Sequence, residues 1–218
     1  MVYRRTAKVE NRLADNRARI LSAAGALVAD AGFREAQIAA VAAAAGLATG
    51  SVYRHFPSKA HLMVELLRAI CAREAEVARA IAEGAGPARE RLADTLWAFV
   101  ERALRGNRLA YAVIAEPASQ EIEDARQEIK RELALIFGGM VSDAAAEGSV
   151  PAQDSDLAGA CIVGAMLEGL MGPLAHKRVT EDDETVAAGI VDFCLRAVGL
   201  ERQDRNAEGG TTHVRAIR

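Results

Sequence analysis

The sequence is poor in aromatic residues, proline and cysteine. Aromatic side chains make up 4% of the 218 residues, and there are five prolines and three cysteines. Cys71, Cys161 and Cys194 are widely spaced within apolar sequence, which excludes a disulfide framework and a C-x-x-C metal site. We interpret them as small core residues of a protein in a reducing compartment, and we expect a cytoplasmic location.

No segment shows the alternation of apolar and polar residues that is typical of half-buried strands. Alanine dominates the apolar content of 51%, and it has the highest intrinsic helix propensity. We therefore predict an all-α protein. No run of 18 uninterrupted apolar residues occurs and the N-terminus lacks the apolar region of a signal peptide, so we expect no membrane partner.

Catalytic signatures are missing as well. The four histidines are scattered and form no cluster with cysteine or carboxylate at metal-binding spacing. There is no phosphate-binding loop, no dinucleotide fingerprint and no G-x-S-x-G elbow. The sequence thus disfavours an enzyme, and we expect neither a cofactor nor a metal.

Charge is distributed unevenly along a chain whose formal net charge is −3. Residues 1–56 contain eight basic and four acidic side chains, whereas the remainder contains 19 basic and 26 acidic ones. A positive N-terminal unit on a negative body favours binding to phosphates at one end. Solvated helix faces can segregate charge in the same way, so the split supports nucleic-acid binding without proving it.

Residues 37–56, QIAAVAAAAGLATGSVYRHF, predict two short helices joined by a tight turn. Apolar residues at i, i+3, i+4 and i+7 give the first helix one buried face. Gly46 can leave that helix with positive φ, and Val52 and Phe56 would hold the second helix on the core. This is the helix-turn-helix arrangement, whose second helix reads the major groove. An ordinary helical hairpin is the alternative, because the pattern is short and permissive.

The motif continues into G-S-V-Y-R-H-F-P-S-K at residues 50–59, with Gly32-Phe33 upstream and Ala45-Gly46-Leu47 in the turn. Over residues 11–70 the sequence resembles the N-terminal DNA-binding unit of the TetR family of transcriptional repressors. The resemblance implies that the second motif helix enters the major groove of double-stranded DNA. The residues that match the family's phosphate and base contacts are Thr49, Ser51, Tyr53, Arg54, His55 and Lys59.

The chain departs from the family pattern at two positions. Ala36 stands where relatives carry a capping Thr or Ser, and Ala48 stands where they carry Ser at the start of the recognition helix. A lost cap costs about 1 kcal/mol, so we expect the motif to survive. Two hydroxyl groups that usually meet phosphates are nevertheless missing.

The helical pattern divides the chain into four segments. Residues 1–10 predict a flexible basic arm that is either disordered or reaches DNA, and residues 11–57 form the helix-turn-helix unit. Residues 58–199 predict a helical domain for effector binding and dimerisation, and residues 200–218 a disordered tail. Within the third segment we predict helices over residues 58–83, 88–105, 108–116, 121–146, 154–171 and 181–198.

The resemblance also implies a small-molecule effector site in the C-terminal domain, below the helix that begins at Ser58. Large apolar side chains are the candidates for its walls, although such residues more often simply fill a core. Few charges among them favour a hydrophobic effector, with Arg102, Arg105 and Arg108 placed to meet an anionic head group at the mouth. The wall candidates are Met63, Leu67, Trp97, Val100, Tyr111, Ile114, Phe137, Met140, Ile162 and Met166.

In residues 157–171, LAGACIVGAMLEGLM, Glu168 is the only charged residue. A helix that is apolar on most sides is buried on most sides, which predicts packing on its own core and on a second copy of the chain. A central helix of a monomer is the alternative. The resemblance implies a four-helix dimer bundle here, with interface candidates Gly159, Ala160, Val163, Gly164, Leu167, Ile190, Phe193 and Cys194.

These observations predict a homodimeric, TetR-like transcriptional repressor that binds a pseudo-palindromic operator and is released by a small, hydrophobic effector. The alternative is a helical ligand carrier or adaptor with a vestigial helix-turn-helix. Salt-dependent retention on DNA distinguishes the two, because phosphate contacts impose a steep dependence on salt concentration.

Overall fold

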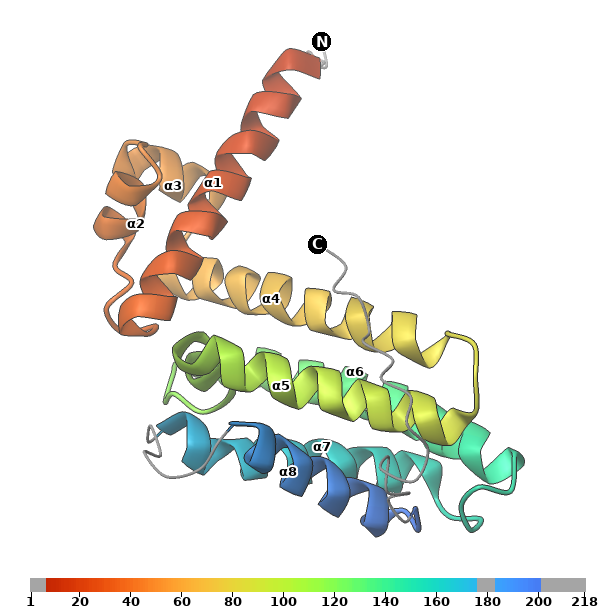
Figure 1. Ribbon diagram of the computed structural model, residues 1–218. Coiled ribbons are helices and arrows are strands. Elements are labelled where there is room, and N and C mark those ends of the chain that lie inside the picture. The colour runs from red at the N-terminus through yellow and green to blue at the C-terminus, as the bar shows by residue number, and fades with distance from the viewer. Residues whose placement is uncertain (1–6, 176–182, 201–218) are drawn as a thin grey trace.

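The computed structural model describes residues 7–175 and 183–200, and within these ranges every regular element is a helix. The predicted all-α fold is therefore confirmed. Figure 1 shows the elements in order. They are α1 (Ala7–Ala31), α2 (Ile38–Ala44), α3 (Thr49–His55), α4 (Lys59–Ala82), α5 (Ala88–Ile114), α6 (Gln120–Ala146), α7 (Ser155–Ala175) and α8 (Asp183–Ala197).

The two ends of the chain differ from the sequence prediction. Helix α1 begins at Ala7, so residues 7–10 of the predicted arm are helical, because they extend a helix whose pattern first becomes amphipathic at Leu13. Residues 1–6 of that arm lie outside the described residues. At the other end, Leu200 is buried in the core of the body and does not belong to a tail, while residues 201–218 lie outside the described ranges.

The N-terminal unit packs α1, α2 and α3 around one apolar cluster. Val41, Val52 and Phe56 are fully buried in it, as the helical periodicity predicted. Gly46 has φ 64° and ends α2, which is the left-handed conformation that favours glycine. The cluster extends beyond Pro57 into the first turns of α4 and includes Met63. The predicted domain boundary after residue 57 therefore cuts through a continuous core.

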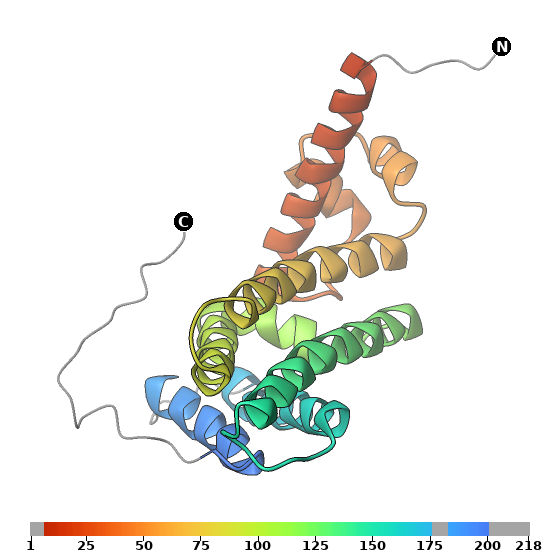
Figure 2. The ribbon, with the colours of Figure 1, turned by 90° about the vertical axis from the view of Figure 1, so that its right-hand side faces the viewer.

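The remaining helices, α5 to α8, pack below α4 and form with it the body of the molecule. Helix α4 runs beneath the N-terminal unit, α5 and α6 follow it, and α7 and α8 close the far side (Figure 1). A view turned by 90° shows the N-terminal unit standing on one end of α4 (Figure 2). Helices α6 and α7 share the most extensive contact. Helix α4 thus belongs to both units and joins them mechanically.

Helix α5 is broken near its end. Asn107 has φ 23° and ψ −86°, which lies outside the helical region, so two helical pieces meet there. We predicted residues 88–105 and the short segment 108–116 as separate elements, and the break at Asn107 lies between them. A non-glycine residue in this conformation carries strain of about 1–3 kcal/mol. The break sets residues 108–114 apart as a short segment with its own direction.

Backbones of α6 and α7 approach closely at two glycines. A Cβ placed on Gly159 would lie 2.2 Å from the carbonyl oxygen of Ala134 and 2.7 Å from the nitrogen of Gly138. Gly159 therefore serves contact within one chain, and its assignment to a dimer interface was wrong. The same correction holds for Val163 and Cys194, which are 3% and 1% exposed in the single chain. Their side chains fill the core of the body.

The other interface candidates reach the surface. Ala160, Gly164 and Phe193 are exposed, and Leu167 and Ile190 are half-buried. Large exposed apolar residues of α7 and α8 accompany them: Leu157 is 62% exposed and Phe193 57% exposed.

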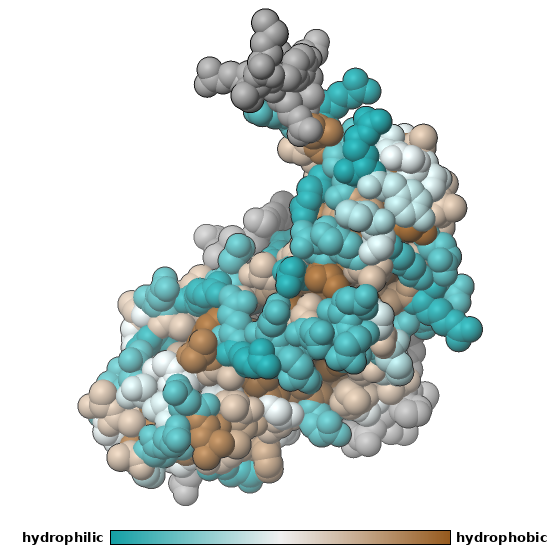
Figure 3. Space-filling view, turned by 180° about the vertical axis from the view of Figure 1, so that it is seen from behind, coloured by the Kyte–Doolittle hydropathy of each residue, from teal (hydrophilic) through white to brown (hydrophobic). Residues whose placement is uncertain are grey.

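The surface of the body is correspondingly mixed. On the face seen from behind in Figure 3, hydrophobic patches interrupt the hydrophilic side chains of the body. Contiguous apolar patches on the surface of a single chain mark sites of interaction, whereas single exposed apolar residues are normal. The large apolar residues that face solvent lie on several helices and are Leu135, Leu157, Met171 and Phe193.

Helix α7 is long and apolar enough to cross a membrane by length and composition. The sequence expectation overlooked this property, because Glu168 interrupts the apolar run while the mean hydropathy of the helix stays high. Core helices of globular proteins pass the same test. Helix α7 buries one side against α5, α6 and α8, so we interpret its composition as that of a packed helix.

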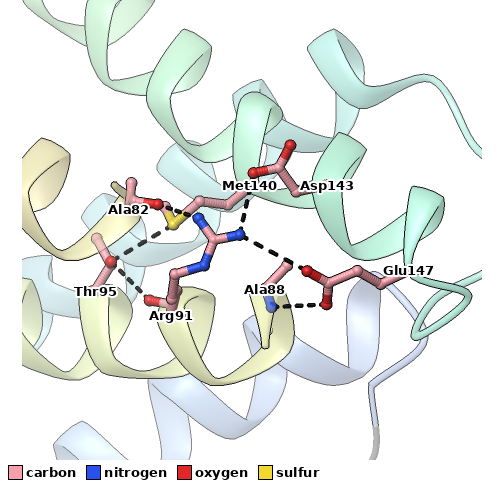
Figure 4. Close-up of polar contacts among 7 residues, drawn as sticks. All are labelled: Ala82, Ala88, Arg91, Thr95, Met140, Asp143 and Glu147. Carbon is pink, nitrogen blue, oxygen red and sulfur yellow. Dashed lines mark hydrogen bonds and ion pairs between the residues drawn. The ribbon is translucent and has the colours of Figure 1, made fainter. Parts of the chain in front are cut away.

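A half-buried arginine joins three helices at the far end of the body (Figure 4). The Arg91 guanidinium donates to the carbonyl oxygen of Ala82 and to Asp143 at 3.3 Å, and it lies 3.9 Å from Glu147. Glu147 in turn accepts a hydrogen bond from the N–H of Ala88 at 2.8 Å. These contacts join the end of α4, the start of α5 and the end of α6.

The α6–α7 contact generates a stability prediction. Gly159→Ala should lower the free energy of unfolding by about 1–3 kcal/mol, because the new methyl group overlaps the backbone of α6. The matched control is Gly139→Ala on α6, where a Cβ meets nothing within 4 Å. The control should raise stability by about 0.5–1 kcal/mol. Denaturant unfolding measures both, and equal effects of the two variants would contradict the close approach.

Candidate nucleic-acid interface and effector cavity

Helix α3 presents one face to the core and the opposite face to solvent. Val52 and Phe56 are 0% exposed. Because successive residues are about 100° apart around a helix, Arg54 projects roughly opposite these two side chains. Tyr53 is 50% exposed. The recognition helix is therefore anchored on one side and free to meet a partner on the other.

The six predicted DNA contacts divide into two groups by exposure. Thr49, Tyr53 and Arg54 are exposed, whereas the other three are half-buried. All six lie on α3 or in the first turn of α4, at one end of the molecule. The half-buried ones are Ser51, His55 and Lys59.

The N-caps of α2 and α3 show which roles Ala36 and Ala48 have in the structure. Ala48 is the N-cap of α3 and provides no side-chain hydrogen bond, as the sequence predicted. At the first motif helix the prediction was wrong, because the N-cap is Gln37 and Ala36 is fully buried. Ala36 therefore fills the core, and a hydroxyl at that position would be buried. Ser58 caps α4 by accepting a hydrogen bond from the His61 N–H at 3.0 Å.

Lys59 is tied to the turn that precedes α2. Its Nζ donates to the carbonyl oxygen of Arg34 at 2.8 Å, and Gln37 Nε2 donates to the same oxygen at 2.8 Å. Burial lowers the pKa of Lys59, while Glu35 and Glu116 act in the opposite direction. An ammonium group carries three donors, so Lys59 can hold this turn and still offer a proton to a phosphate.

Glu116 joins the body to the N-terminal unit. Its carboxylate accepts hydrogen bonds from the N–H groups of Phe33 at 3.1 Å and Arg34 at 3.3 Å. Gly32 has φ 86°, and a Cβ there would lie 2.5 Å from the Glu116 carboxylate. The absence of a side chain at Gly32 thus lets the carboxylate reach the backbone. This contact, which we call the Glu116 bridge, links the corner between α5 and α6 to the turn between α1 and α2.

Arg126 holds in place the corner between α5 and α6, which contains Glu116. Its side chain is 6% exposed and donates to the carbonyl oxygens of Val113 at 2.8 Å, Ala112 at 2.7 Å and Glu116 at 2.8 Å. It also forms an ion pair with Glu123 at 2.5 Å. Carbonyl groups at the end of a helix have no partner within the helix, so Arg126 satisfies the last turn of α5 and binds it to α6.

A cavity of about 200 Å³ lies inside the body, among α4, α5, α6 and α7. Each of the first three helices contributes a stripe at i, i+3, i+4 and i+7, which is one helical face. Residues that follow the break at Asn107 complete the wall with Leu167 of α7. The stripes are Leu67, Ile70, Cys71 and Glu74; Phe99, Arg102, Ala103 and Gly106; and Arg126, Ile129, Lys130 and Leu133, completed by Leu109, Ala110, Val113 and Ile114.

The cavity wall is mostly apolar but contains a bound charge pair. The guanidinium of Arg102 donates to both oxygens of Glu74, at 3.0 and 2.9 Å, and this hydrogen bonding raises the pKa of Arg102. Burial raises the pKa of Cys71 to about 12, with Glu74 adding to the effect. The thiol is therefore neutral at physiological pH and acts as part of the apolar wall.

Two of the ten predicted wall residues, Leu67 and Ile114, line this cavity, and Arg102 lies in its wall as predicted. The other eight do not, because large side chains in the centre of a core fill space and leave none. Met63 belongs to the N-terminal core, and Trp97 and Tyr111 pack on the outside of the body core. The remaining five are fully or almost fully buried: Val100, Phe137, Met140, Ile162 and Met166.

The cavity-wall residues that were not predicted share a recognisable sequence pattern. Each stripe interrupts an apolar helical face with a charged side chain: Glu74 in α4, Arg102 in α5, and Arg126 with Lys130 in α6. A charge on the buried face of a helix needs a partner or a ligand. The predicted wall residues did not include these charged side chains, because all the candidates were large and apolar.

Within residues 7–175 and 183–200, no group of three or more His, Cys, Asp or Glu side chains is placed to hold a metal ion. The polar side chains of the cavity are engaged in the contacts described above, with the exception of Lys130.

An exposed recognition helix on a three-helix unit, continued through one long helix into an all-helical body, is the architecture of a helix-turn-helix DNA-binding protein. Residues 20–66 match the model of the family described as bacterial regulatory proteins, tetR family. This match lies within residues 11–70, over which the sequence resembles the TetR family.

Curated relatives match only a part of the chain. The HTH-type transcriptional repressor KstR of Mycobacterium tuberculosis (strain ATCC 25618 / H37Rv) is 40% identical over 74 residues, which are 34% of this chain and 34% of the relative. KstR of Rhodococcus jostii (strain RHA1) is 47% identical over 53 residues, 24% of this chain and 25% of that protein. The match thus spans about a third or less of these relatives.

The whole fold resembles a solved regulator. The structure of FadR from Bacillus subtilis in complex with stearoyl-CoA superposes with a TM-score of 0.71. The two chains are 20% identical, and the match covers 81% of this chain and 96% of FadR. At this identity the likeness establishes the shared fold.

The Glu116 bridge generates a local prediction. Glu116→Ala should accelerate amide hydrogen exchange at Phe33 and Arg34, because both N–H groups lose their acceptor, and should lower global stability by about 1 kcal/mol. Glu147→Ala is the matched control, since it removes a carboxylate that accepts one backbone N–H at the far end of the body. Unchanged exchange at Phe33 and Arg34 in Glu116→Ala would show that the bridge does not form in solution.

Proposed function

We propose that the protein is a homodimeric transcriptional repressor that binds a pseudo-palindromic DNA operator through α3 and is released by a small, hydrophobic effector held in the cavity. The carrying observation is that Tyr53 and Arg54 are exposed on a helix whose other face is anchored by Val52 and Phe56. A carrier with a vestigial helix-turn-helix has no need of such a face. The relatives that match this unit are repressors by name.

In the DNA complex, Arg54 and Tyr53 contact base edges or phosphates in the major groove, and Thr49 lies at the start of the same helix. Ser51, His55 and Lys59 contact mainly phosphates, which set the orientation of the helix on the duplex. Arg54 and His55 lie in the last turn of α3, where the helix dipole favours cations.

Dimerisation uses the exposed apolar face of α7 and α8. Leu157 and Phe193 expose more than half of their surface in the single chain, and Ala160 and Gly164 leave room for close approach of a second helix pair. A symmetric four-helix contact would cover these residues in both copies. It would also set the distance between the two recognition helices, as a two-fold operator requires.

Release follows from the position of residues 109–114. Leu109, Ala110, Val113 and Ile114 line the cavity, and the segment leads directly to Glu116, which contacts the turn before α2. An effector that favours a different position of this segment shifts the Glu116 bridge and α4 with it. The effector acts only insofar as it binds the two arrangements unequally.

The DNA-binding proposal is tested by Arg54→Ala. The probe is a duplex selected by the wild-type protein from a random-sequence library, and the variant should bind it about 1–3 kcal/mol more weakly by gel shift. Arg73→Ala is the matched control, because it removes an exposed arginine from α4 in the body. Equal binding by both variants would refute the role of Arg54, and salt-independent retention of the wild type would favour the carrier.

The dimer proposal is tested by Phe193→Asp. A charge in the centre of an apolar interface is desolvated without a partner, so the variant should sediment as a monomer at concentrations where the wild type is a dimer. Leu135→Asp places the same charge at a residue of α6 that is 66% exposed and lies outside the proposed face. If Leu135→Asp alone disrupts the dimer, the interface lies elsewhere.

A further inference from the structure

A second hollow adjoins the cavity. It has a volume of about 420 Å³ and forms a groove between α6 and α7. Ala160 and Gly164 of the proposed dimer face line its α7 side, so the two-fold contact would border this groove. Ile114, Lys130 and Leu167 line both spaces. These three side chains therefore lie between the two spaces, and a ligand that extends from one space into the other has to pass them.

The two spaces differ in chemistry. The cavity wall is formed largely by aliphatic side chains, whereas polar side chains gather along the groove. These groove residues are Gln127, Lys130, Arg131 and Glu168. Such a pair of spaces fits a molecule with an apolar body and a polar head.

The charges at the junction indicate the sign of that head. In the cavity, Arg102 is neutralised by Glu74, and Arg126 is engaged by three carbonyl groups and Glu123. Lys130 is half-buried and has no hydrogen bond or ion pair with any described residue. A half-buried ammonium group without a partner favours an anion beside it.

Arg131 supplies a second cation along the groove, and Glu168 on α7 supplies the one acidic side chain. Arg131, like Lys130, is not paired within the described part of the chain. The groove therefore carries one net positive charge, and the cation nearest the apolar cavity is Lys130. An anionic group at the junction of cavity and groove would form an ion pair with Lys130. A cationic group at the same place would be repelled by it.

The size of the cavity limits the apolar body. A cavity of about 150 Å³ lined by aliphatic and aromatic residues holds benzene, and the cavity here is about 200 Å³. It therefore accommodates a single ring or a short to medium acyl chain without rearrangement. A longer chain would have to displace the wall.

We propose that the effector is an amphipathic anion, with a short apolar body in the cavity and an anionic head group in the α6–α7 groove against Lys130. This assignment rests on the proposed function of the cavity as an effector site. A free carboxylate and an acyl thioester with a phosphate-bearing carrier share this chemistry. In either case Lys130 determines specificity for the head group.

The test compares octanoate and octanoyl-CoA with the uncharged octanol and the cationic octylamine, by calorimetric titration of the full-length protein. At least one of the two anions should bind more tightly than octanol, and octylamine should bind most weakly. Binding by octanoate assigns the head as a carboxylate, whereas binding by octanoyl-CoA alone assigns it as the phosphate-bearing group.

Lys130→Met should weaken binding of that anion by about ten- to a hundredfold, the range of one charge-assisted hydrogen bond, and leave octanol unchanged. Lys130→Arg should retain most of the affinity. Arg73→Met is the control for general charge loss. Equal binding of octanol and both anions, no binding of any of them, or an unaltered affinity in Lys130→Met would each overturn the assignment.

Gel shift on the selected duplex, with the same preparations, separates this inference from the proposed function. Retained DNA binding with no preference for anions refutes the ligand class and leaves the repressor intact. Anion binding without DNA binding supports the ligand class and refutes the repressor.

Discussion

The buried guanidinium of Arg126 is the interaction on which the geometry of the body depends. It donates hydrogen bonds to three carbonyl oxygens at the end of α5 and in the corner that follows, and it forms an ion pair with Glu123. Without it, these carbonyls would be buried without a partner in a region of low dielectric constant. Because Glu116 is one of the residues so held, the bridge to the N-terminal unit is positioned by a residue of α6 that also lines the cavity.

One short segment of the chain has three structural roles. Residues 108–114 are separated from the rest of α5 by the strained Asn107, they form part of the cavity wall, and they end at the corner that touches the turn before α2. Coupling between two sites needs a contiguous element with more than one arrangement. The break at Asn107 gives this segment freedom to move without bending the whole of α5.

The sequence predicted the parts of the fold that depend on local rules. The helix-turn-helix was predicted from Gly46 and from the pair Val52 and Phe56, because turns are encoded in a few adjacent residues. An effector site was expected from the family resemblance, but most of the cavity wall was not predicted, because empty space depends on how the helices face one another. The largest apolar residues, such as Phe137, fill the core, while smaller and charged residues such as Ala103 and Lys130 surround the hollow.

The close approach of α6 and α7 at Gly159 has a mechanical consequence. Backbone atoms in contact leave no side chains that could change rotamer, so α6 and α7 are fixed to one another at this point. Elsewhere the cavity is bounded by α4 and by the part of α5 that follows the break, whose side chains are partly buried. We therefore expect an occupant of the cavity to displace those side chains sooner than the α6–α7 contact at Gly159.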